Sequence, residues 1–215
     1  MGRGTGELAE QGRPENSDRS LAESLIAGNP EAFEPFVTRF GPLILNFGRR
    51  MCGRRADAED LLQETLLKAY QSLRRLRDPA ALKGWVYRVA ANTCLKLRRR
   101  NAGATKRTLS IDDLLPRPDA PGGSPEIADW SDIPLDRLLQ GELRVRLEDA
   151  VLALPKDFRV VLILREQEGF STRETASILG ISEDLAKVRL HRARLAVRKA
   201  MEGYLSGPAG HAAKR

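Results

Sequence analysis

The sequence is poor in cysteine, histidine and aromatic residues, and these shortages exclude several kinds of site. Its 215 residues include two cysteines and two histidines, and 5% are aromatic. Cys52 and Cys94 lie far apart, without a CxxC pair or a nearby pair of histidines, so neither a zinc site nor a disulfide framework is indicated. This cysteine content fits a reduced cytosolic compartment. So few aromatic residues favour small helical modules over a large sandwich or barrel.

Long apolar runs and catalytic residue patterns are also missing. No stretch approaches the length of a transmembrane helix, and the first twenty residues lack the apolar core of a signal peptide. We therefore expect a soluble, cytoplasmic protein with no membrane insertion. The sequence shows no Ser/His/Asp array, no glycine-rich phosphate loop and no metal-ligand spacing. It predicts a binding protein with no catalytic residues, no metal and no cofactor.

Positive charge is what the chain has in excess. It carries 36 Lys and Arg against 29 Asp and Glu, a net charge of +7. This excess favours polyanionic partners, although many basic proteins bind no nucleic acid. The charge is uneven, because residues 101–142 hold four Lys and Arg against eight Asp and Glu, a net of −4. An acidic segment therefore interrupts a basic chain.

Helical patterns occupy two separate parts of the sequence. They dominate residues 20–100, where Asn29-Pro30, Gly41-Pro42 and Asp78-Pro79 are expected to separate helices. They return in residues 138–204 with apolar residues at helical spacing. The predicted fold is all-α, with two small helical domains joined by an acidic flexible linker, the C-terminal domain being a helix-turn-helix.

The remaining segments lack a hydrophobic period. Residues 1–19 are polar and rich in glycine, which predicts a disordered N-terminal arm. Residues 101–137 are rich in Pro, Gly, Asp and Ser, which predicts the linker. Residues 205–215 are assigned as a C-terminal tail.

The C-terminal region carries the signals of a helix-turn-helix. Ser171 and Glu174 have the spacing of a capping box, and Gly180 tolerates the left-handed conformation of a tight turn. Ser182 can then cap a second helix. Two helices joined in this way form a helix-turn-helix, although an ordinary helical hairpin has the same turn.

The second helix of this pair has two different sides. Its predicted core side carries Ala186, Leu190, Ala193, Val197 and Ala200. From Lys187 to Lys199 the charged residues are all positive, and Val188 lies among them. This pattern favours a helix that enters the major groove of DNA, with cations for phosphates and base edges. A lone histidine on a helix is usually a surface residue, so only the position of His191 between Lys187 and Arg192 supports a role in DNA binding.

Residues 55–73 predict a helix with an acidic exposed side. The predicted core residues are Ala58, Leu61, Leu62, Thr65, Leu66, Ala69 and Leu73. Asp57, Asp60 and Glu64 lie on the opposite side with Leu67. An apolar anchor among carboxylates suits a protein interface with a basic partner. A solvated acidic surface explains the segment equally well.

Residues 82–100 predict a helix with a mixed aromatic and basic side. Its predicted core residues are Leu82, Val86, Val89, Ala90, Thr93 and Leu97, and the far side carries Trp85, Arg88, Asn92, Lys96 and Arg99. Such a surface suits nucleic acid, because cations follow phosphates and a ring can stack on an unpaired base. Alternatively, Trp85 is a core residue at the domain edge, and the arginines that end the segment only stabilise a helix terminus.

The order of these segments resembles one protein family. DAEDLLQETLLKAYQSL followed by WVYRVAANTCLKLRRR resembles the second conserved region of bacterial RNA polymerase sigma factors of the extracytoplasmic-function (ECF) group. LPKDFRVVLILREQEGFSTRETASILGISEDLAKVRLHRAR resembles the fourth region. Together the two blocks cover most of residues 21–202, and their order and spacing are more specific than either helix-turn-helix or charge.

This resemblance implies a promoter-specificity factor that starts transcription of a stress or signal regulon. The first domain would bind core RNA polymerase through Asp57, Asp60, Gln63, Glu64 and Leu67. It would also melt and capture the −10 element, with a flipped base held by the loop between Leu76 and Lys83. The implied −10 contacts are Arg77, Asp78, Lys83, Trp85, Arg88, Asn92, Lys96 and Arg99. The second domain would read the −35 element as duplex through Ser171, Thr172, Arg173, Lys187, Val188, His191, Arg192, Arg194 and Arg198.

The implied partners are core RNA polymerase and promoter DNA, and the resemblance allows an anti-sigma protein as a third. Two other functions remain open from the residues alone. A stand-alone dimeric helix-turn-helix regulator would explain the C-terminal region but gives the acidic helix and the linker no role. An adaptor with solvated charged helices would bind no DNA in either domain.

The predicted linker gives a first test. Pro116, Pro118, Pro121, Pro125 and Pro134 interrupt every candidate helix between residues 101 and 137. Limited proteolysis of the purified chain should therefore cut first within these residues, as mass spectrometry of the fragments would show. Protection of this segment until the helical domains are digested would contradict the prediction.

Overall fold

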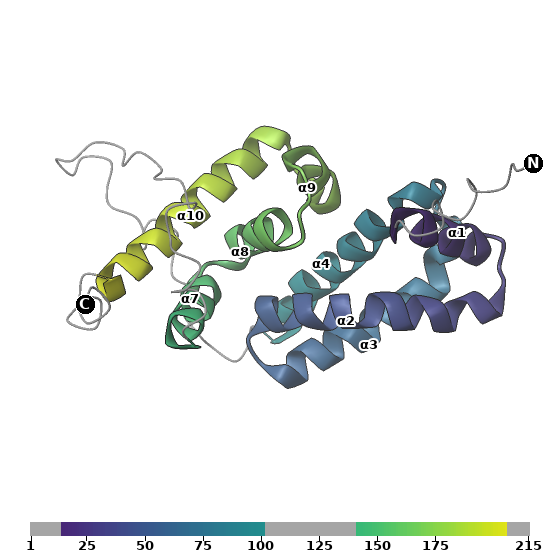
Figure 1. Cartoon of the computed structure of the whole chain (residues 1–215), viewed down its shortest axis with the longest axis horizontal. Coiled ribbons are helices and arrows are strands. Elements are labelled where there is room, and N and C mark those ends of the chain that lie inside the picture. The colour runs from purple at the N-terminus through teal and green to yellow at the C-terminus, as the bar shows by residue number, and fades with distance from the viewer. Residues whose placement is uncertain (1–13, 102–140, 206–215) are drawn as a thin grey trace, which may run out of the picture. The chain divides into compact units, whose positions relative to one another are not determined.

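The computed structural model describes residues 14–101 and 141–205, which form two separate helical units (Figure 1). Every regular element in these ranges is a helix or a helical turn, in agreement with the predicted all-α fold. Most of the predicted arm, linker and tail lie outside the described residues. Within the described part of the chain, no helix is both long and apolar enough to cross a bilayer.

Helix α1 (Pro14–Ile26) begins inside residues 1–19, so the predicted disordered arm is wrong for residues 14–19. Proline suits a first helical turn, where its missing N–H has no partner to lose. Asp18 fixes α1 on the next helix by accepting two hydrogen bonds from Arg39, 2.9 Å from Nε to Oδ1 and 3.2 Å from Nη2 to Oδ2. These bonds raise the pKa of the Arg39 guanidinium above its ordinary value. A contact between distant residues thus stabilises a helix that local composition argues against.

Helix α2 (Phe33–Cys52) follows a short turn, η1 (Pro30–Ala32), which Asn29 caps through a 3.0 Å hydrogen bond from Glu31 N. The expected break at Asn29-Pro30 is therefore confirmed. The expected break at Gly41-Pro42 is wrong, because Pro42 lies inside α2. A proline there costs about 3 kcal/mol. Each large side chain that the helix buries returns about 1.5–3 kcal/mol, and one side of α2 buries Phe36, Phe40, Ile44, Phe47 and Met51.

Helix α3 (Arg55–Ser72) packs along α2, as Figure 1 shows. Gly53 ends α2 in the left-handed region, with φ 75°, and so lets the chain reverse. Gly48 marks the closest approach of the two helices: a Cβ atom at this position would lie 3.1 Å from both Cα and Cβ of Ala58. The buried residues of α3 face α2, and they are Ala58, Leu61, Thr65 and Ala69.

Helix α4 (Leu82–Asn101) follows two short turns, η2 (Leu73–Arg75) and η3 (Pro79–Ala81). Asp78 caps η3 by accepting a 3.0 Å hydrogen bond from Ala80 N, which confirms the expected break at Asp78-Pro79. Helix α4 contacts α2 through an edge-to-face pair of Phe47 and Tyr87 with centroids 5.6 Å apart. It contacts α3 through Lys68 Nζ, which donates to Thr93 Oγ1 at 2.8 Å.

These two contacts widen the buried side of α4 beyond the prediction. Val89 is half-buried rather than buried, whereas the buried residues are Leu82, Val86, Tyr87, Ala90, Ala91, Thr93 and Cys94. Leu97 was also predicted in the core, but its side chain is not among those that the structure describes. A helix that packs on two neighbours buries a wider arc than the single stripe assumed from sequence.

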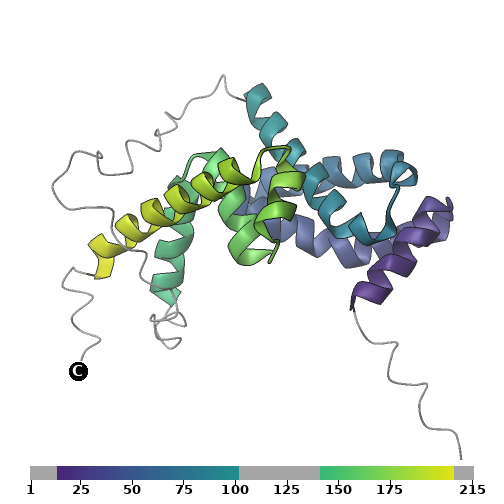
Figure 2. The ribbon, with the colours of Figure 1, turned by 90° about the horizontal axis from the view of Figure 1, so that it is seen from above.

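The second unit consists of α7 (Gly141–Ala153), α8 (Lys156–Leu162), the π-helical turn η5 (Ile163–Gln167), α9 (Thr172–Leu179) and α10 (Glu183–Leu205). Figures 1 and 2 both show α10 as one continuous helix. It packs against α7, α8 and α9. Arg159 is buried in α8, and its Nη2 donates to the carbonyl oxygens of Leu152 and Leu154, the latter at 2.8 Å. Arg159 thereby satisfies carbonyl groups at the end of α7.

The close approach at Gly48 predicts a stability effect. Gly48→Val should lower the free energy of unfolding by about 1–3 kcal/mol, because the added atoms meet the backbone of Ala58. Gly41→Ala is the matched control in the same helix, since its Cβ would meet only Val37, at 3.9 Å. That control should be neutral or more stable by up to about 1 kcal/mol. Urea unfolding followed by circular dichroism measures both, and equal stability of Gly48→Val and the parent would contradict the account.

Candidate protein and nucleic-acid interfaces

One side of α3 exposes two large apolar residues. The exposed fractions of Leu67 and Tyr70 are 59% and 66%, although both belong to a helix whose other side is buried. Asp60 and Gln63 are exposed on the same side. We name Asp60, Gln63, Leu67 and Tyr70 the α3 face. The ring of Tyr70 lies edge-on to Phe33, with centroids 5.1 Å apart, so this anchor has a defined position.

The α3 face differs in part from the set predicted by sequence. Asp57 and Glu64 are half-buried, as are Leu62 and Leu66, which were expected in the core. The carboxylate of Glu64 already has an intramolecular partner, because Lys68 Nζ donates to its Oε2 at 3.2 Å. Tyr70 is a residue that the sequence prediction missed. Its position three residues after Leu67, on the same side of the helix, could have identified it.

The predicted nucleic-acid side of α4 lies partly at the surface. Arg88, Asn92 and Lys96 are exposed on one side of the helix, and Trp85 is half-buried beside them. We name these four residues the α4 face. Since Trp85 is neither buried nor fully exposed, part of its ring remains accessible. The side chain of Arg99 is not among those that the structure describes.

The segment before α4 holds the other predicted contacts. Arg77 and Lys83 are exposed. Asp78 is also exposed, but its carboxylate already accepts the capping hydrogen bond from Ala80 N. Asp78 therefore shapes the turn η3, and a second role for its carboxylate would have to coexist with the cap.

The predicted helix-turn-helix is present in α9 and α10. Ser171 Oγ accepts from Glu174 N at 3.2 Å, and Ser171 N donates to Glu174 Oε2 at 2.7 Å, which completes the capping box. Gly180 ends α9 with φ 66° and ψ 37°. Ser182 Oγ then accepts from Leu185 N at 3.2 Å and caps α10. These local contacts fix the direction in which α10 leaves the turn.

Helix α10 separates a small-residue buried side from a cationic exposed side. Ala186, Leu190, Ala193 and Val197 are buried as predicted. Ala200 is exposed, so its predicted core position is wrong; the longer side chain of Met201 is buried in its place. The opposite side carries Lys187, Val188, His191 and Arg192, all exposed, and we name these four residues the α10 face.

Several predicted DNA contacts lie in intramolecular ion pairs. Lys187 Nζ is 3.1 Å from Asp184 Oδ1, and Arg198 Nε is 2.8 Å from Glu202 Oε1, both within α10. Arg194 Nη2 is 2.6 Å from Glu166 Oε1, which joins α10 to η5. The Lys187 and Arg198 pairs join neighbouring turns of α10 and leave both cations near the surface. The Arg194 pair instead links α10 to η5. Arg194 therefore has a structural role in addition to any contact with DNA.

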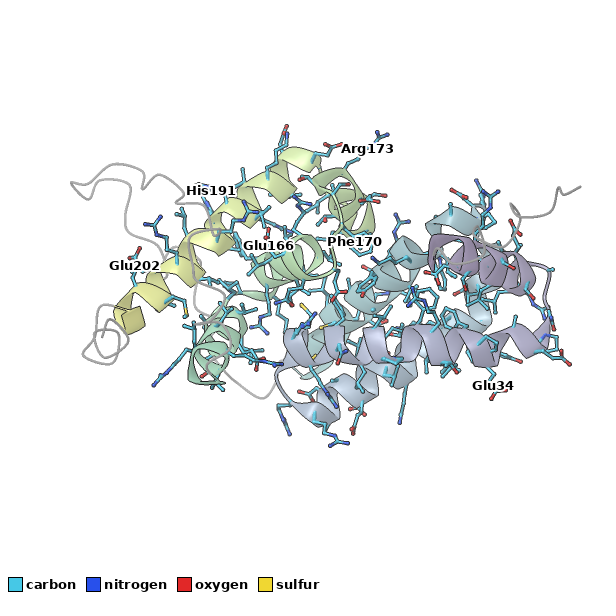
Figure 3. All side chains as sticks on the ribbon, viewed as in Figure 1. Glu34, Glu166, Phe170, Arg173, His191 and Glu202 are labelled. Carbon is cyan, nitrogen blue, oxygen red and sulfur yellow. The ribbon has the colours of Figure 1, made fainter. Side chains whose placement is uncertain are left out.

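Figure 3 shows how these residues lie on the second unit. His191 on α10 and Arg173 on α9 project outward, whereas Glu166 lies on the segment beneath α10. Ser171 and Arg173 are exposed and Thr172 is half-buried, so the start of α9 is accessible. No cluster of three or more metal-ligating side chains occurs in residues 14–101 or 141–205. The arrangement consists of surfaces suited to binding.

Two protein-family models match the two units separately. The model "Sigma-70 region 2" matches residues 36–103, which include the α3 and α4 faces. The model "Sigma-70, region 4" matches residues 144–197, which include the helix-turn-helix. The first match gives the N-terminal unit a role that a stand-alone helix-turn-helix regulator would leave unexplained, so that alternative is not favoured.

Curated relatives and solved structures agree with these matches. The chain is 30% identical to the ECF RNA polymerase sigma factor SigM of Mycobacterium tuberculosis over 91% of this chain and 89% of that protein. It is 28% identical to the RNA polymerase sigma-H factor of Pseudomonas aeruginosa over 89% of this chain and 97% of that protein.

The fold is similar to CnrH, solved in complex with the cytosolic domain of CnrY. The TM-score is 0.60 and the identity 24%, over 87% of this chain and 98% of CnrH. It is also similar to the sigma factor RpoE of Bartonella quintana, solved with the anti-sigma factor NepR, with a TM-score of 0.56 and 22% identity over 79% and 96% of the two chains. The chain therefore belongs to the ECF sigma factors, which are non-enzymatic promoter-specificity factors of RNA polymerase.

Proposed function

We propose that the α3 face is the surface on which this sigma factor binds core RNA polymerase. The observation that carries the proposal is the exposure of Leu67 and Tyr70 on a helix that is otherwise packed. Apolar anchors at an interface gain free energy when a partner covers them. Asp60 beside them favours a basic partner and speeds encounter with it.

The α4 face and the turns before it are proposed to bind the −10 element. Arg88 and Lys96 are both exposed on α4, about two helical turns apart, and two such cations can contact the phosphates of one strand. Trp85 offers a partly accessible ring on which an unstacked base can lie. Arg77 and Lys83 flank the turn η3 and add positive charge where a flipped base would enter.

The α10 face is proposed to read the −35 element in the major groove. Its residues occupy the first half of α10, which is the part of a recognition helix that contacts base edges. Val188, with an exposed fraction of 48%, is available to a thymine methyl group. Arg173 at the start of α9, Arg198 and Lys199 are proposed to contact phosphates.

We propose that a sigma factor with these surfaces starts transcription of a stress or signal regulon in the cytoplasm, where RNA polymerase works. An anti-sigma protein is proposed as a further partner. The α3 face gives such a protein an apolar surface to cover, and covering it would exclude polymerase. The same exposure of Leu67 and Tyr70 thus supports both activity and inhibition.

Reversing the charge of Asp60 tests the docking surface. Asp60→Lys should weaken binding of the full chain to core RNA polymerase about tenfold, since it removes an attraction and adds a repulsion at the edge of the anchors. Glu23→Lys makes the same charge change on α1, outside the α3 face, and should bind like the parent because its ion pair with Arg19 is exposed. Affinity is measured by fluorescence anisotropy, with helicity checked by circular dichroism. Equal affinities of the two variants would refute this docking surface.

Loss of a base contact and loss of a phosphate contact on α10 should have different effects. Arg192→Ala or His191→Ala should change base preference at one or two positions of the −35 element, at about 1–3 kcal/mol per lost contact. Lys199→Ala should weaken all promoters alike and lower the slope of log affinity against log salt by about one ion. A promoter-library selection with holoenzyme at fixed salt separates these effects. Identical sequence preferences in all three variants would show that α10 is basic without reading bases.

A further inference from the structure

The structure brings together the two cysteines that lie far apart in the sequence. Cys52 is the last residue of α2 and Cys94 lies in α4, 42 residues away, yet their Sγ atoms are 3.8 Å apart. Neither cysteine is in a disulfide. We propose that Cys52 and Cys94 form a peroxide-sensitive dithiol, a modification site that takes a hydroperoxide and becomes an intramolecular disulfide.

The neighbouring packing holds the two thiols in place. Phe47 precedes Cys52 on α2, Tyr87 precedes Cys94 on α4, and these two rings make the 5.6 Å edge-to-face contact between the helices. A second contact, from Lys68 to Thr93, fixes α4 at the residue next to Cys94. The separation of the sulfur atoms is therefore set by the fold on both sides.

The separation suits oxidation. A disulfide has an S–S distance of about 2.05 Å, so the sulfur atoms must approach by a little under 2 Å. Rotation of the Cys52 side chain is the available movement, because Cys52 is half-buried at a helix end whereas Cys94 is 1% exposed. The same difference in burial assigns the roles: Cys52 meets the oxidant, and Cys94 resolves the product.

The proposed reaction has two steps. The thiolate of Cys52 attacks one oxygen of the peroxide, the O–O bond breaks, and the leaving oxygen takes a proton as water or an alcohol. Cys52 is then a sulfenic acid, oxidised by two electrons, while the peroxide is reduced. The thiolate of Cys94 attacks Cys52 Sγ, the S–O bond breaks, and water leaves as the disulfide forms. Two thiols and one hydroperoxide give one disulfide, one water and one alcohol or second water.

Metal binding fits the pair less well than oxidation. Within residues 14–101 and 141–205, no third His, Cys, Asp or Glu joins the two thiols in a potential metal site. In a reducing compartment such a dithiol stays reduced until an oxidant appears, which is the usual condition of a redox-sensitive pair. Oxidation would close a loop that contains all of α3, and would tie the start of that helix to α4.

The test uses the purified full-length chain, reduced, freed of reductant and treated with hydrogen peroxide. Remaining thiols are then alkylated, and the products are mapped by mass spectrometry. A peptide pair linked through Cys52 and Cys94, lost on treatment with dithiothreitol, should be the main product in the native protein. The same treatment in urea should give less linked product and more dimers and overoxidised cysteine, because the fold no longer holds the thiols together.

Single substitutions test the assigned roles. Cys94→Ser should leave a sulfenic acid on Cys52 that dimedone traps, whereas Cys52→Ser should leave Cys94 largely unreacted because it is buried. The proposal is overturned if native parent protein keeps both thiols or if the linked product forms equally in urea. The assay contains neither polymerase nor DNA, so its result is independent of the proposed interfaces. If a variant fails to fold, the comparison of native and urea-treated parent still decides.

Discussion

The close packing of α3 on α2 determines what the N-terminal unit can present to a partner. Gly48 has no Cβ, so the backbone of Ala58 can lie against it at a distance that any other side chain would obstruct. A helix has one side to bury and one to expose once its neighbour is this close. Burial of Leu61 and Ala69 against α2 therefore directs Asp60, Leu67 and Tyr70 outward. The α3 face follows from a contact on the opposite side of the helix.

The same constraint operates in the second unit through small residues. Ala186, Ala193 and Ala196 are buried on α10, and their short side chains allow the helix to lie close to the elements beneath it. The turn at Gly180 fixes where α10 begins, so the buried alanines also fix which cations are outward. Helices α3 and α10 thus expose opposite chemistry by one mechanism. An acidic and apolar side suits a protein partner, and a cationic side suits DNA.

The sequence predicted features that depend on local spacing. Helical periodicity identified most of the exposed sides of α4 and α10 and, on α3, Asp60 and Leu67, whereas Asp57 and Glu64 are half-buried. The capping residues Ser171 and Ser182 identified the helix-turn-helix. It failed where a distant contact overrides a local signal. Pro42 lies inside α2 because the buried aromatic side of that helix outweighs the lost hydrogen bond.

Contacts between remote residues explain the other differences. The Asp18–Arg39 pair spans 21 residues, the Arg194–Glu166 pair 28, and the approach of Cys52 to Cys94 42. No periodic pattern encodes such pairs, because their members lie on different helices. They become visible only when the helices are placed in space. For this reason the sequence could predict the exposed surfaces, but not the contacts between distant residues that connect the helices.

The relative strengths of these contacts indicate how the N-terminal unit would use its two proposed surfaces. Full burial of a leucine contributes about 1.5–3 kcal/mol, whereas an exposed ion pair contributes about 0–1 kcal/mol. Leu67 and Tyr70 would therefore supply most of the affinity for a protein partner, and Asp60 its selectivity. Lys68 connects the helices that carry both surfaces, since it donates to Glu64 beside the α3 face and to Thr93 on α4. Because the Lys68 side chain joins α3 to α4, a partner that binds the α3 face binds a rigid pair of helices that also carries the α4 face.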